Sequence, residues 1–582
     1  MASRKVGILW FLGIIGCFAA LPANAQSFRV QCPTSTITHP DAGVNNSEAN
    51  YIGPTYTGTS GYPAAPANVN GAIKCQQVSG GDGYATMADG TQTFMFSFGP
   101  LSGLSKIANG QAGTDFPSEF NTVYPGTLAP GDPATTDGAL ANSWLPWSPT
   151  LPIVPIGSFT WDGAVGLTGD QNVFVDDGTG KNACVTNSLP PAACLTGHVD
   201  PRQIIDVGVM NGNIPAPLVA FDEDDEMFLT LTNVGMIMRP DLFEQHTIHF
   251  HGYPNASSVY DGVPDASVAI NIGGSFTYYY FAPDAGTYFW HCHITPPEHL
   301  QMGMVGQLYV RPRQNRVPSG TTLYAALQTQ QTDLRTACRR PGDGVIPSVS
   351  AAPDILCANP LPAGGDNLTP GGFSNGTATK KYAYNDGDGS TAYDTEYALQ
   401  IHGFDPNFHF VGMTFNPENF ATMKDKYFLL NGRSYPDTVT PGPLATQSSD
   451  GRTHFSQPLP SIINIPVGGK ALLRIADLDV SEYQTLATLG IPMKEVGFNA
   501  KLLRDQAGNN LEFYTNSITL GGGESLDVIL DASNASLYPA GSVFYLYTPN
   551  LDHLSNDAEN FGGLMTEVHI CAAVDPVTQA CK

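Results

Sequence analysis

Six of the chain's thirteen histidines lie in two short stretches about forty residues apart. The first stretch, residues 246–252, reads HTIHFHG, and the second, residues 286–293, reads GTYFWHCH and continues to His299 and Met304. Imidazole, thiolate and thioether groups side by side favour copper, and two histidines, one cysteine and a weak axial methionine form a centre that transfers single electrons. The residue types therefore predict a copper site.

The alternation of side chains along a strand predicts a second metal site close to the first. Successive side chains of a strand point to opposite faces, so Cys292 can face one side while His291 and His293 face the other. His249 and His251 share a face for the same reason. We therefore expect Cys292, His291 and His293 to be the catalytic residues that connect two metal sites.

Composition limits the fold and the partners. The chain has 582 residues, with 62 Gly, 46 Pro and only 13% charged residues, which is typical of a large β-protein with many turns. Its net charge of −26 excludes nucleic acid and anionic membranes as favoured partners, because both repel an acidic surface.

The N-terminal residues predict export. Arg4 and Lys5 precede an apolar run over 6–21, and Ala23-Asn24-Ala25 then offers a cleavage site for a signal peptide that comprises residues 1–25. A membrane anchor or a lipoprotein site at Cys17 is the alternative. No later stretch is long and apolar enough to span a bilayer. We expect a periplasmic, outer-surface or secreted protein.

Cysteine usage agrees with an oxidising compartment. Beyond Cys17, eight cysteines fall into pairs that are near in sequence, and Cys292 is left over. The simplest pairing predicts four disulfides and one reserved thiolate. The pairs are Cys32/Cys75, Cys184/Cys194, Cys338/Cys357 and Cys571/Cys581.

Short alternating segments predict strands at regular spacing from residue 204 onward. The acidic run 222–226 is interpreted as the solvated start of a strand rather than a metal site. Residues 285–293 resemble residues 540–548, which indicates an internal repeat whose second copy lacks the metal-binding residues. The expected organisation is a signal peptide (1–25), a β-rich N-terminal region or insertion (26–200), a copper-binding unit (201–315), a connector (316–395) and a second, copper-free unit (396–582).

The two motifs resemble those of the multicopper oxidase family, whose copper-bearing domain carries His-Pro-x-His-x-His-Gly and His-Cys-His with identical histidine spacing. The resemblance implies an all-β chain of tandem cupredoxin-like Greek-key β-sandwich domains. It also implies the copper ligands: His246, Cys292 and His299 with axial Met304 for type 1 copper, His249 for type 2 copper, and His251, His291 and His293 for a type 3 pair.

The chain departs from this family in three ways. Five residues, 294–298, separate His293 from His299, where the family has three. The second unit lacks the second pair of histidine motifs that a complete three-copper cluster needs; His402, His409 and His553 are interpreted as structural or surface residues, with isolated ligands as the alternative. The copper-bearing unit also comes first, an order that copper nitrite reductases share.

The resemblance implies an extracytoplasmic copper oxidoreductase that takes electrons from a small-molecule or metal-ion reductant, such as a phenol or a low-valent metal ion, and passes them through Cys292 to dioxygen. A non-catalytic blue-copper electron carrier or copper-binding protein is one alternative, and a nitrite-reductase-like enzyme is another. The missing histidines also allow a homo-oligomer in which two subunits complete one cluster.

Overall fold

The structure is a computed structural model of the chain. It describes residues 72–100, 212–316 and 381–582 with short gaps, together with a few shorter segments: 31–33, 36, 101–103, 107, 112–117, 373–374 and 377–378. The predicted signal peptide, Cys17, and the pairs Cys184/Cys194 and Cys338/Cys357 lie outside the described residues.

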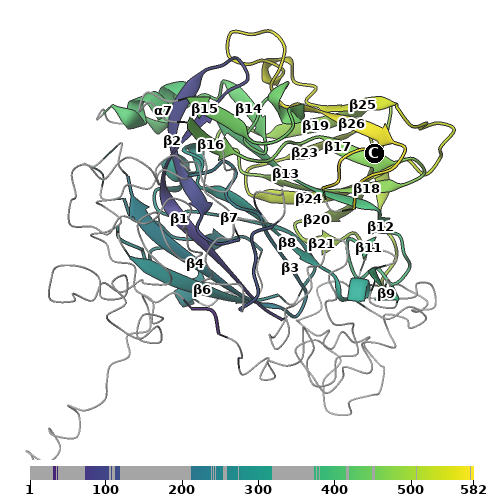
Figure 1. The fold of residues 1–582 in the computed structure, drawn as a ribbon, viewed down its shortest axis with the longest axis horizontal. Helices are drawn as coiled ribbons and strands as arrows, with labels where there is room; N and C mark the ends of the chain where they lie inside the picture. The colour runs from purple at the N-terminus through teal and green to yellow at the C-terminus, as the bar shows by residue number, and fades with distance from the viewer. Residues whose placement is uncertain are drawn as a thin grey trace, which may run out of the picture.

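The first unit is a sandwich of two four-stranded sheets (Figure 1). One sheet has the spatial order β2 (Gln92–Pro100), β1 (Ile73–Thr86), β4 (Glu226–Gly235) and β6 (Ser275–Phe281). The other has the order β3 (Val219–Asp222), β8 (Val305–Arg311), β7 (Gly286–His291) and β5 (His249–Phe250).

The second unit is a larger sandwich, and its two sheets enclose a separate aliphatic core. One sheet has the order β14 (Tyr427–Leu430), β13 (Thr395–Phe404), β18 (Lys470–Asp477), β24 (Glu524–Asp531), β20 (Met493–Phe498) and β21 (Lys501–Leu502), with β22 (Phe513–Thr515) also paired to β20. The other has the order β17 (Ile463–Pro466), β26 (Met565–Cys571), β25 (Val543–Tyr547), β19 (Gln484–Leu489) and β23 (Ser517–Leu520).

The smaller elements lie around these sandwiches. Among the described residues they are three two-stranded sheets and two α-helices: β9 (Phe373–Ser374) with β10 (Thr377–Ala378), β11 (Lys381–Tyr382) with β12 (Ala392–Tyr393), β15 (Leu444–Gln447) with β16 (Thr453–Gln457), α5 (Pro296–Gln301) and α7 (Pro406–Met413). None of the helices in the described part of the chain combines the length and apolarity that crossing a bilayer requires.

The two units repeat one topology, which confirms the internal repeat. In each, a parallel pair (β1 with β4, β13 with β18) is extended by an antiparallel strand (β6 or β24). In the facing sheets, β3 runs parallel to β8 and β7 antiparallel to it, as β17 and β25 do beside β26. The predicted all-β class and tandem sandwiches are confirmed.

The hairpin of β1 and β2 belongs to the first unit, although the predicted organisation placed its residues in a separate region over 26–200. β1 pairs in parallel with β4 from Ile73 to Gly81, and β2 pairs with β1 at the edge, so this hairpin supplies two of the sheet's four strands. The local sequence did not reveal this, because parallel partners are joined by a long connection and lie far apart in the chain. We propose that residues 73–100 and 212–316 together form the copper-binding unit.

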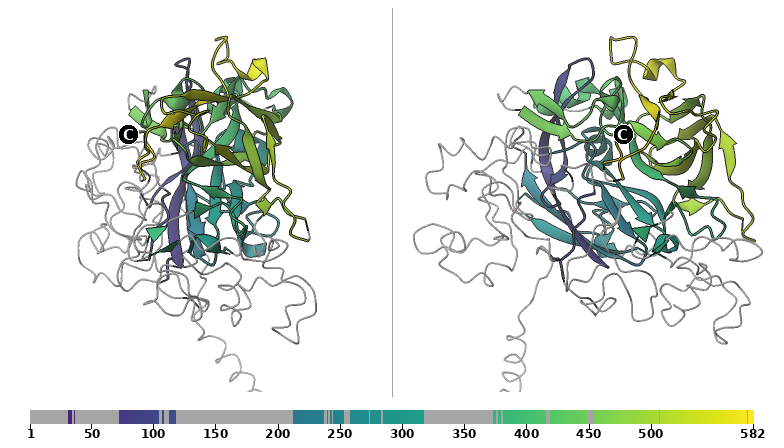
Figure 2. Two further views of the ribbon diagram at one scale, coloured as in Figure 1. Left: turned by 90° about the vertical axis from the view of Figure 1, so that its right-hand side faces the viewer. Right: turned by 45° about the vertical axis from the view of Figure 1, so that its right-hand side comes forward.

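The same hairpin also reaches the second unit. In Figures 1 and 2 its purple ribbon runs from the first sandwich to the region of α7, β15 and β16. The Gln457 side chain accepts a hydrogen bond from the Thr86 N–H and donates one to the Thr86 carbonyl. The Phe94 carbonyl faces the ring of His409 at 2.7 Å. The two sandwiches are therefore fixed to each other by polar contacts as well as by apolar packing.

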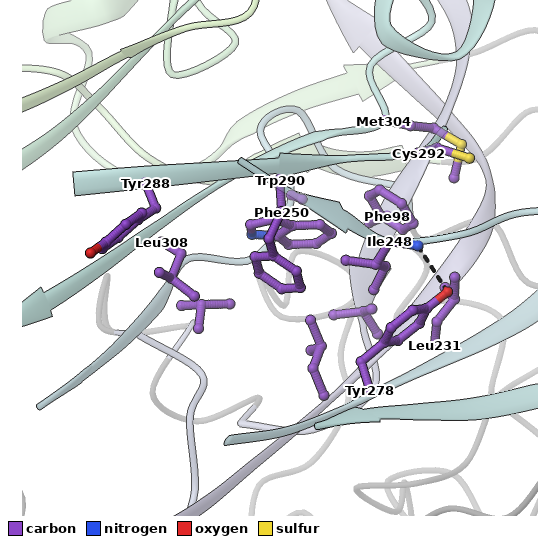
Figure 3. Close-up of a cluster of buried hydrophobic side chains, with 14 of the residues drawn as sticks. Phe98, Leu231, Ile248, Phe250, Tyr278, Tyr288, Trp290, Cys292, Met304 and Leu308 are labelled. Atoms are coloured by element: carbon purple, nitrogen blue, oxygen red, sulfur yellow. Dashed lines mark hydrogen bonds between the residues drawn. The ribbon is translucent and has the colours of Figure 1, made fainter. Parts of the chain in front are cut away.

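The core of the first unit surrounds β7 and Cys292, the residue that follows it (Figure 3). Trp290 is fully buried and packs against Phe98, with ring centroids 4.8 Å apart, and against Phe250. The Tyr278 hydroxyl accepts a hydrogen bond of 3.0 Å from the Ile248 N–H, which fixes the first histidine stretch against β6. The aromatic core thus holds both motifs in place.

Two of the four predicted disulfides lie among the described residues. Cys32–Cys75 and Cys571–Cys581 are bonded as predicted, and Cys292 is free and buried.

The interpretation of 222–226 as a solvated segment is wrong. These residues are buried because basic side chains pair with them: Arg313 grips Asp224 with two nitrogens, at 2.7 and 2.8 Å, and Lys74 pairs with Asp225.

Candidate metal centres

The first centre is a buried group of three side chains, His246, Cys292 and His299, whose ligand atoms all lie within 4.8 Å of one another. The Cys292 sulfur lies 3.1 Å from Nδ1 of His299 and 4.0 Å from Nδ1 of His246. Met304 is also fully buried, and Figure 3 shows its sulfur beside that of Cys292. The four side chains predicted for the first centre therefore meet at one point.

The longer loop after His293 does not displace His299 from this point. Residues 296–301 form the short helix α5, which begins at Thr295 with a left-handed φ of 38°. The helix turns the chain back, so that His299 faces Cys292 and the Cys292 N–H donates to the Met304 carbonyl at 3.2 Å. The two additional residues are absorbed by this helical turn.

The electrostatics of the first centre favour a thiolate. Burial by itself would raise the pKa of Cys292, but the charge of His299 and hydrogen bonds from His246 and His299 hold that pKa well below its usual value. The Thr247 N–H also donates to the sulfur at 3.4 Å. Burial alone would lower the pKa of His299, yet Cys292 and Glu244 raise it to about 10. The sulfur is thus held in the form that binds metals.

Three residues at this centre were not identified from the sequence. Gly80 of β1 leaves room for the site, because a Cβ there would lie 2.7 Å from Cδ2 of His246. Phe96 of β2 packs edge-on against His299, with ring centroids 5.1 Å apart. The Glu244 carboxylate, partly exposed, lies 3.4 Å from Nε2 of His299 and so connects the buried ring to the surface. Of the three, only Glu244 could have been noticed in the sequence, because it is an acidic residue two positions before the first histidine motif.

The second centre is formed by histidines on the opposite face of the same strands. His249, His251 and His291 have ligand atoms within 4.8 Å of one another. The rings of His249 and His291 lie 5.0 and 5.6 Å from the ring of His293, measured between centroids. The register aligns His249 opposite His291, which is why the two motifs meet here. All four predicted histidines therefore gather, while Cys292 faces away from them.

Backbone carbonyls orient two of these rings. Nδ1 of His249 lies 2.6 Å from the Asp261 carbonyl, and Nδ1 of His291 lies 2.7 Å from the Cys292 carbonyl. The Nε2 atoms are thereby turned inward, and those of His251 and His291 lie only 2.8 Å apart. Two facing ring nitrogens need a proton or a cation between them.

Both of these facing histidines favour the neutral, metal-binding form. Burial, and then the neighbouring His249 and His293, lower the pKa of His251 to about 4. Burial also dominates at His291 and lowers its pKa to about 3. A bound cation suits this site better than a second proton, because copper accepts the lone pairs that the neutral rings present.

The second unit contributes no imidazole to this centre within the described residues. It approaches His251 with Gly523, where a Cβ would lie 3.8 Å from the ring. The rings of His402, His409 and His553 are engaged elsewhere, by the Gln301 carbonyl in the first two cases and by Gln484 and Glu482 in the third. These contacts favour the structural interpretation of the three histidines.

The donor sets fit copper at both centres. A buried thiolate with two imidazoles and a thioether is a set that suits copper, and converging neutral imidazoles also bind it well. The first centre lies within the protein, whereas His249, His251 and His293 at the second are only partly buried.

One segment of the chain, which includes both histidine motifs, is similar to known proteins. Residues 196–315 match the family model of multicopper oxidases. Over 138 residues the chain is 31% identical to multicopper oxidase MCE of Talaromyces pinophilus, covering 23% of this chain and 21% of that protein. Over 136 residues it is 32% identical to Laccase-1 of Emericella nidulans, covering 23% and 20%. The chain thus spans about a fifth of the length of these relatives.

The blue copper oxidase of Nitrosomonas europaea aligns with 62% of this chain and 78% of its own, at 21% sequence identity and a TM-score of 0.38. The multicopper oxidase mgLAC aligns with 64% of this chain and 85% of its own, at 17% identity and a TM-score of 0.39.

Proposed function

We propose that this chain, which carries a multicopper oxidase domain over residues 196–315, is an exported copper-dependent oxidoreductase. With copper bound, the first centre would accept electrons from a phenol or a low-valent metal ion, and the second centre would pass them to dioxygen. When bound, copper supplies the one-electron chemistry at both centres. The ligands are His246, Cys292, His299 and Met304 at the first centre, and His249, His251, His291 and His293 at the second.

One observation carries this proposal: Cys292 lies with His246 and His299, whereas its neighbour His291 lies with His249 and His251, and the ring of His293 lies 5.0 Å from that of His249. The backbone from Cys292 to His291 and to His293 is therefore a covalent connection between two metal sites. The carbonyl of Cys292 is also hydrogen-bonded to His291, which adds a second short connection.

The protein contributes orientation and the exclusion of water. At the first centre, full burial of Cys292, His246 and His299 keeps the thiolate dry, and fixed ligands reduce the reorganisation that accompanies electron transfer. The His299 ring has a polar link to the surface, because its Nε2 lies 3.4 Å from the partly exposed carboxylate of Glu244. We assign electron entry to this edge.

The test is copper quantitation with electron paramagnetic resonance on copper-loaded protein, combined with oxygen consumption in the presence of a phenol or Fe²⁺. The proposal expects two or more coppers per chain and reductant-dependent loss of oxygen. One copper per chain, a reversible redox couple and no oxygen consumption would instead support the electron-carrier alternative, which is favoured because the described part of the chain brings four imidazoles, and no more, to the second centre. Nitrite turnover would support the alternative that the chain is a nitrite-reductase-like enzyme.

A further inference from the structure

Helix α5 carries the ligand His299, yet it has little stability of its own. It contains six residues, it begins with two prolines, and Thr295 at its start makes no side-chain capping bond. An isolated helix of this length does not persist in water. Contacts with the rest of the protein must therefore hold it, and with it the position of His299.

Those contacts converge on Gln301, the last residue of the helix, which is completely buried. Its side-chain nitrogen donates to Oδ1 of Asp425 at 2.9 Å, and its side-chain oxygen accepts from the Asp405 N–H at 2.9 Å. Its carbonyl faces Nε2 of His409 at 2.9 Å and Nε2 of His402 at 3.3 Å. All four partners belong to the copper-free second unit.

The partners of Gln301 are themselves fixed. Asp405 caps α7 by accepting from two backbone N–H groups, and its other oxygen accepts from the Lys424 N–H at 2.8 Å. The Ser481 hydroxyl donates to Asp425. Gly403 makes space for the carboxylate of Asp425, since a Cβ there would collide with it and with the neighbouring carboxylate of Asp479. The groups that bind the Gln301 side chain are thus held in place by other residues of the second unit.

The geometry transmits this anchorage to the metal ligands over a short distance. His299 precedes Gln301 by two residues, and the Met304 N–H donates back to the His299 carbonyl at 2.9 Å. Leu300 adds an apolar anchor, because it packs with Ala476 and Leu478 of the second unit. A shift at Gln301 would therefore move His299 and Met304 together, relative to Cys292 on its strand.

We propose that Gln301 is a positioning residue through which the copper-free second unit sets the geometry, and thereby the reduction potential, of the first centre. The part that concerns the potential rests on the proposed function, whereas the positioning of α5 over Cys292 does not. In this proposal, the second unit fixes α5 and the ligand His299 that it carries.

The primary experiment uses the metal-free full chain and measures the rate at which a small thiol reagent modifies Cys292. Gln301→Met keeps the length and burial of the side chain but removes its hydrogen bonds, so that Oδ1 of Asp425 and the Asp405 N–H each lose the bond from or to Gln301. We expect modification about tenfold faster or more than in the unsubstituted chain, as the loss of buried hydrogen bonds opens α5 more often.

Gln307→Met is the matched control. Gln307 is also buried, and its side chain also donates across the two units, to the Arg474 carbonyl at 2.8 Å, but it lies on β8 opposite Phe289. A general loosening between the units would accelerate both variants equally and would overturn the proposal, as would an unchanged rate in Gln301→Met. If Gln301→Met does not fold, Gln301→Asn, shorter by one methylene, is measured in its place with the same criteria.

A second measurement separates this proposal from the proposed function. In copper-loaded protein, Gln301→Glu is expected to shift the thiolate-to-copper absorption and the midpoint potential, and Gln301→Glu with Asp425→Asn, which restores a hydrogen bond in the reverse direction, is expected to return both toward their original values. An unchanged spectrum in a copper-loaded Gln301→Glu would refute the role in tuning. A chain that takes up no copper at Cys292 would refute the proposed function, while the thiol measurement still decides the role of Gln301.

Discussion

Glu396 offers a quantitative test of how the two units are joined. It lies on β13 of the second unit, and Oε1 accepts from Nε of Arg474 at 2.7 Å while Oε2 lies 3.2 Å from Arg311 of the first unit. Burial by itself would raise the pKa of Glu396, but Arg311 and Arg474 outweigh it and lower the pKa from its usual 4.5 to about 2. The carboxylate is therefore an ionised bridge between the units.

The sign and size of the effect follow from linkage. Because the folded-state pKa is depressed, the stabilisation is fully present above pH 4.5 and is lost as the pH falls through 4.5 toward 2. A depression from 4.5 to about 2 corresponds to about 3 kcal/mol of unfolding free energy. Glu396→Gln should remove this contribution and leave the fully buried Arg474 short of a counter-charge.

The assay is urea denaturation followed by tryptophan fluorescence between pH 7 and pH 2.5. We expect the unfolding free energy of the unsubstituted chain to exceed that of Glu396→Gln by about 3 kcal/mol or more at pH 7. This difference should shrink as the pH approaches 2.5. Glu559→Gln, at an exposed carboxylate, is the control and should parallel the unsubstituted chain. A difference between the unsubstituted chain and Glu396→Gln that stays constant over this range would refute the reasoning.

Three further changes test the fold and the centres. Gly306→Ala should lower unfolding free energy by about 1–3 kcal/mol in thermal or urea denaturation, because the new Cβ would lie 2.6 Å from Cζ2 of the buried Trp290. Replacing both Cys32 and Cys75 by Ala should cost about 4 kcal/mol in urea denaturation, from the sequence separation of 43 that this disulfide closes; no change would contradict its role. His251→Ala should weaken copper at the second centre while the blue absorption of the first persists, and joint loss of both signals would contradict two separate centres.

Much of the candidate site was predictable because it depends on local rules. Alternation along a strand separates Cys292 from His291 and His293 wherever that strand lies, and the structure places them on opposite faces. The parity of the cysteines singled out Cys292, which is free and buried. The repeat of residues 285–293 by 540–548 indicated two units of one topology.

The sequence was less informative where charge and turn residues conceal structure. The run 222–226 resembles a solvated segment, but Arg313 and Lys74 approach from elsewhere in the chain and allow its burial. The hairpin of β1 and β2 contains several glycines that weaken the strand pattern, although Gly80 is needed so that β1 can pass close to His246.

By itself, the sequence determined which side chains could bind soft metals, their spacing along the chain and their division between two faces, because these properties follow from residue type and from the period of a strand. Only the tertiary structure decided that a lengthened loop returns His299 to Cys292, and that Gln301 is held by residues of the second unit. The partners of Gln301 lie about a hundred residues further along the chain. Contacts over such separations depend on how two sandwiches pack, which no local pattern encodes.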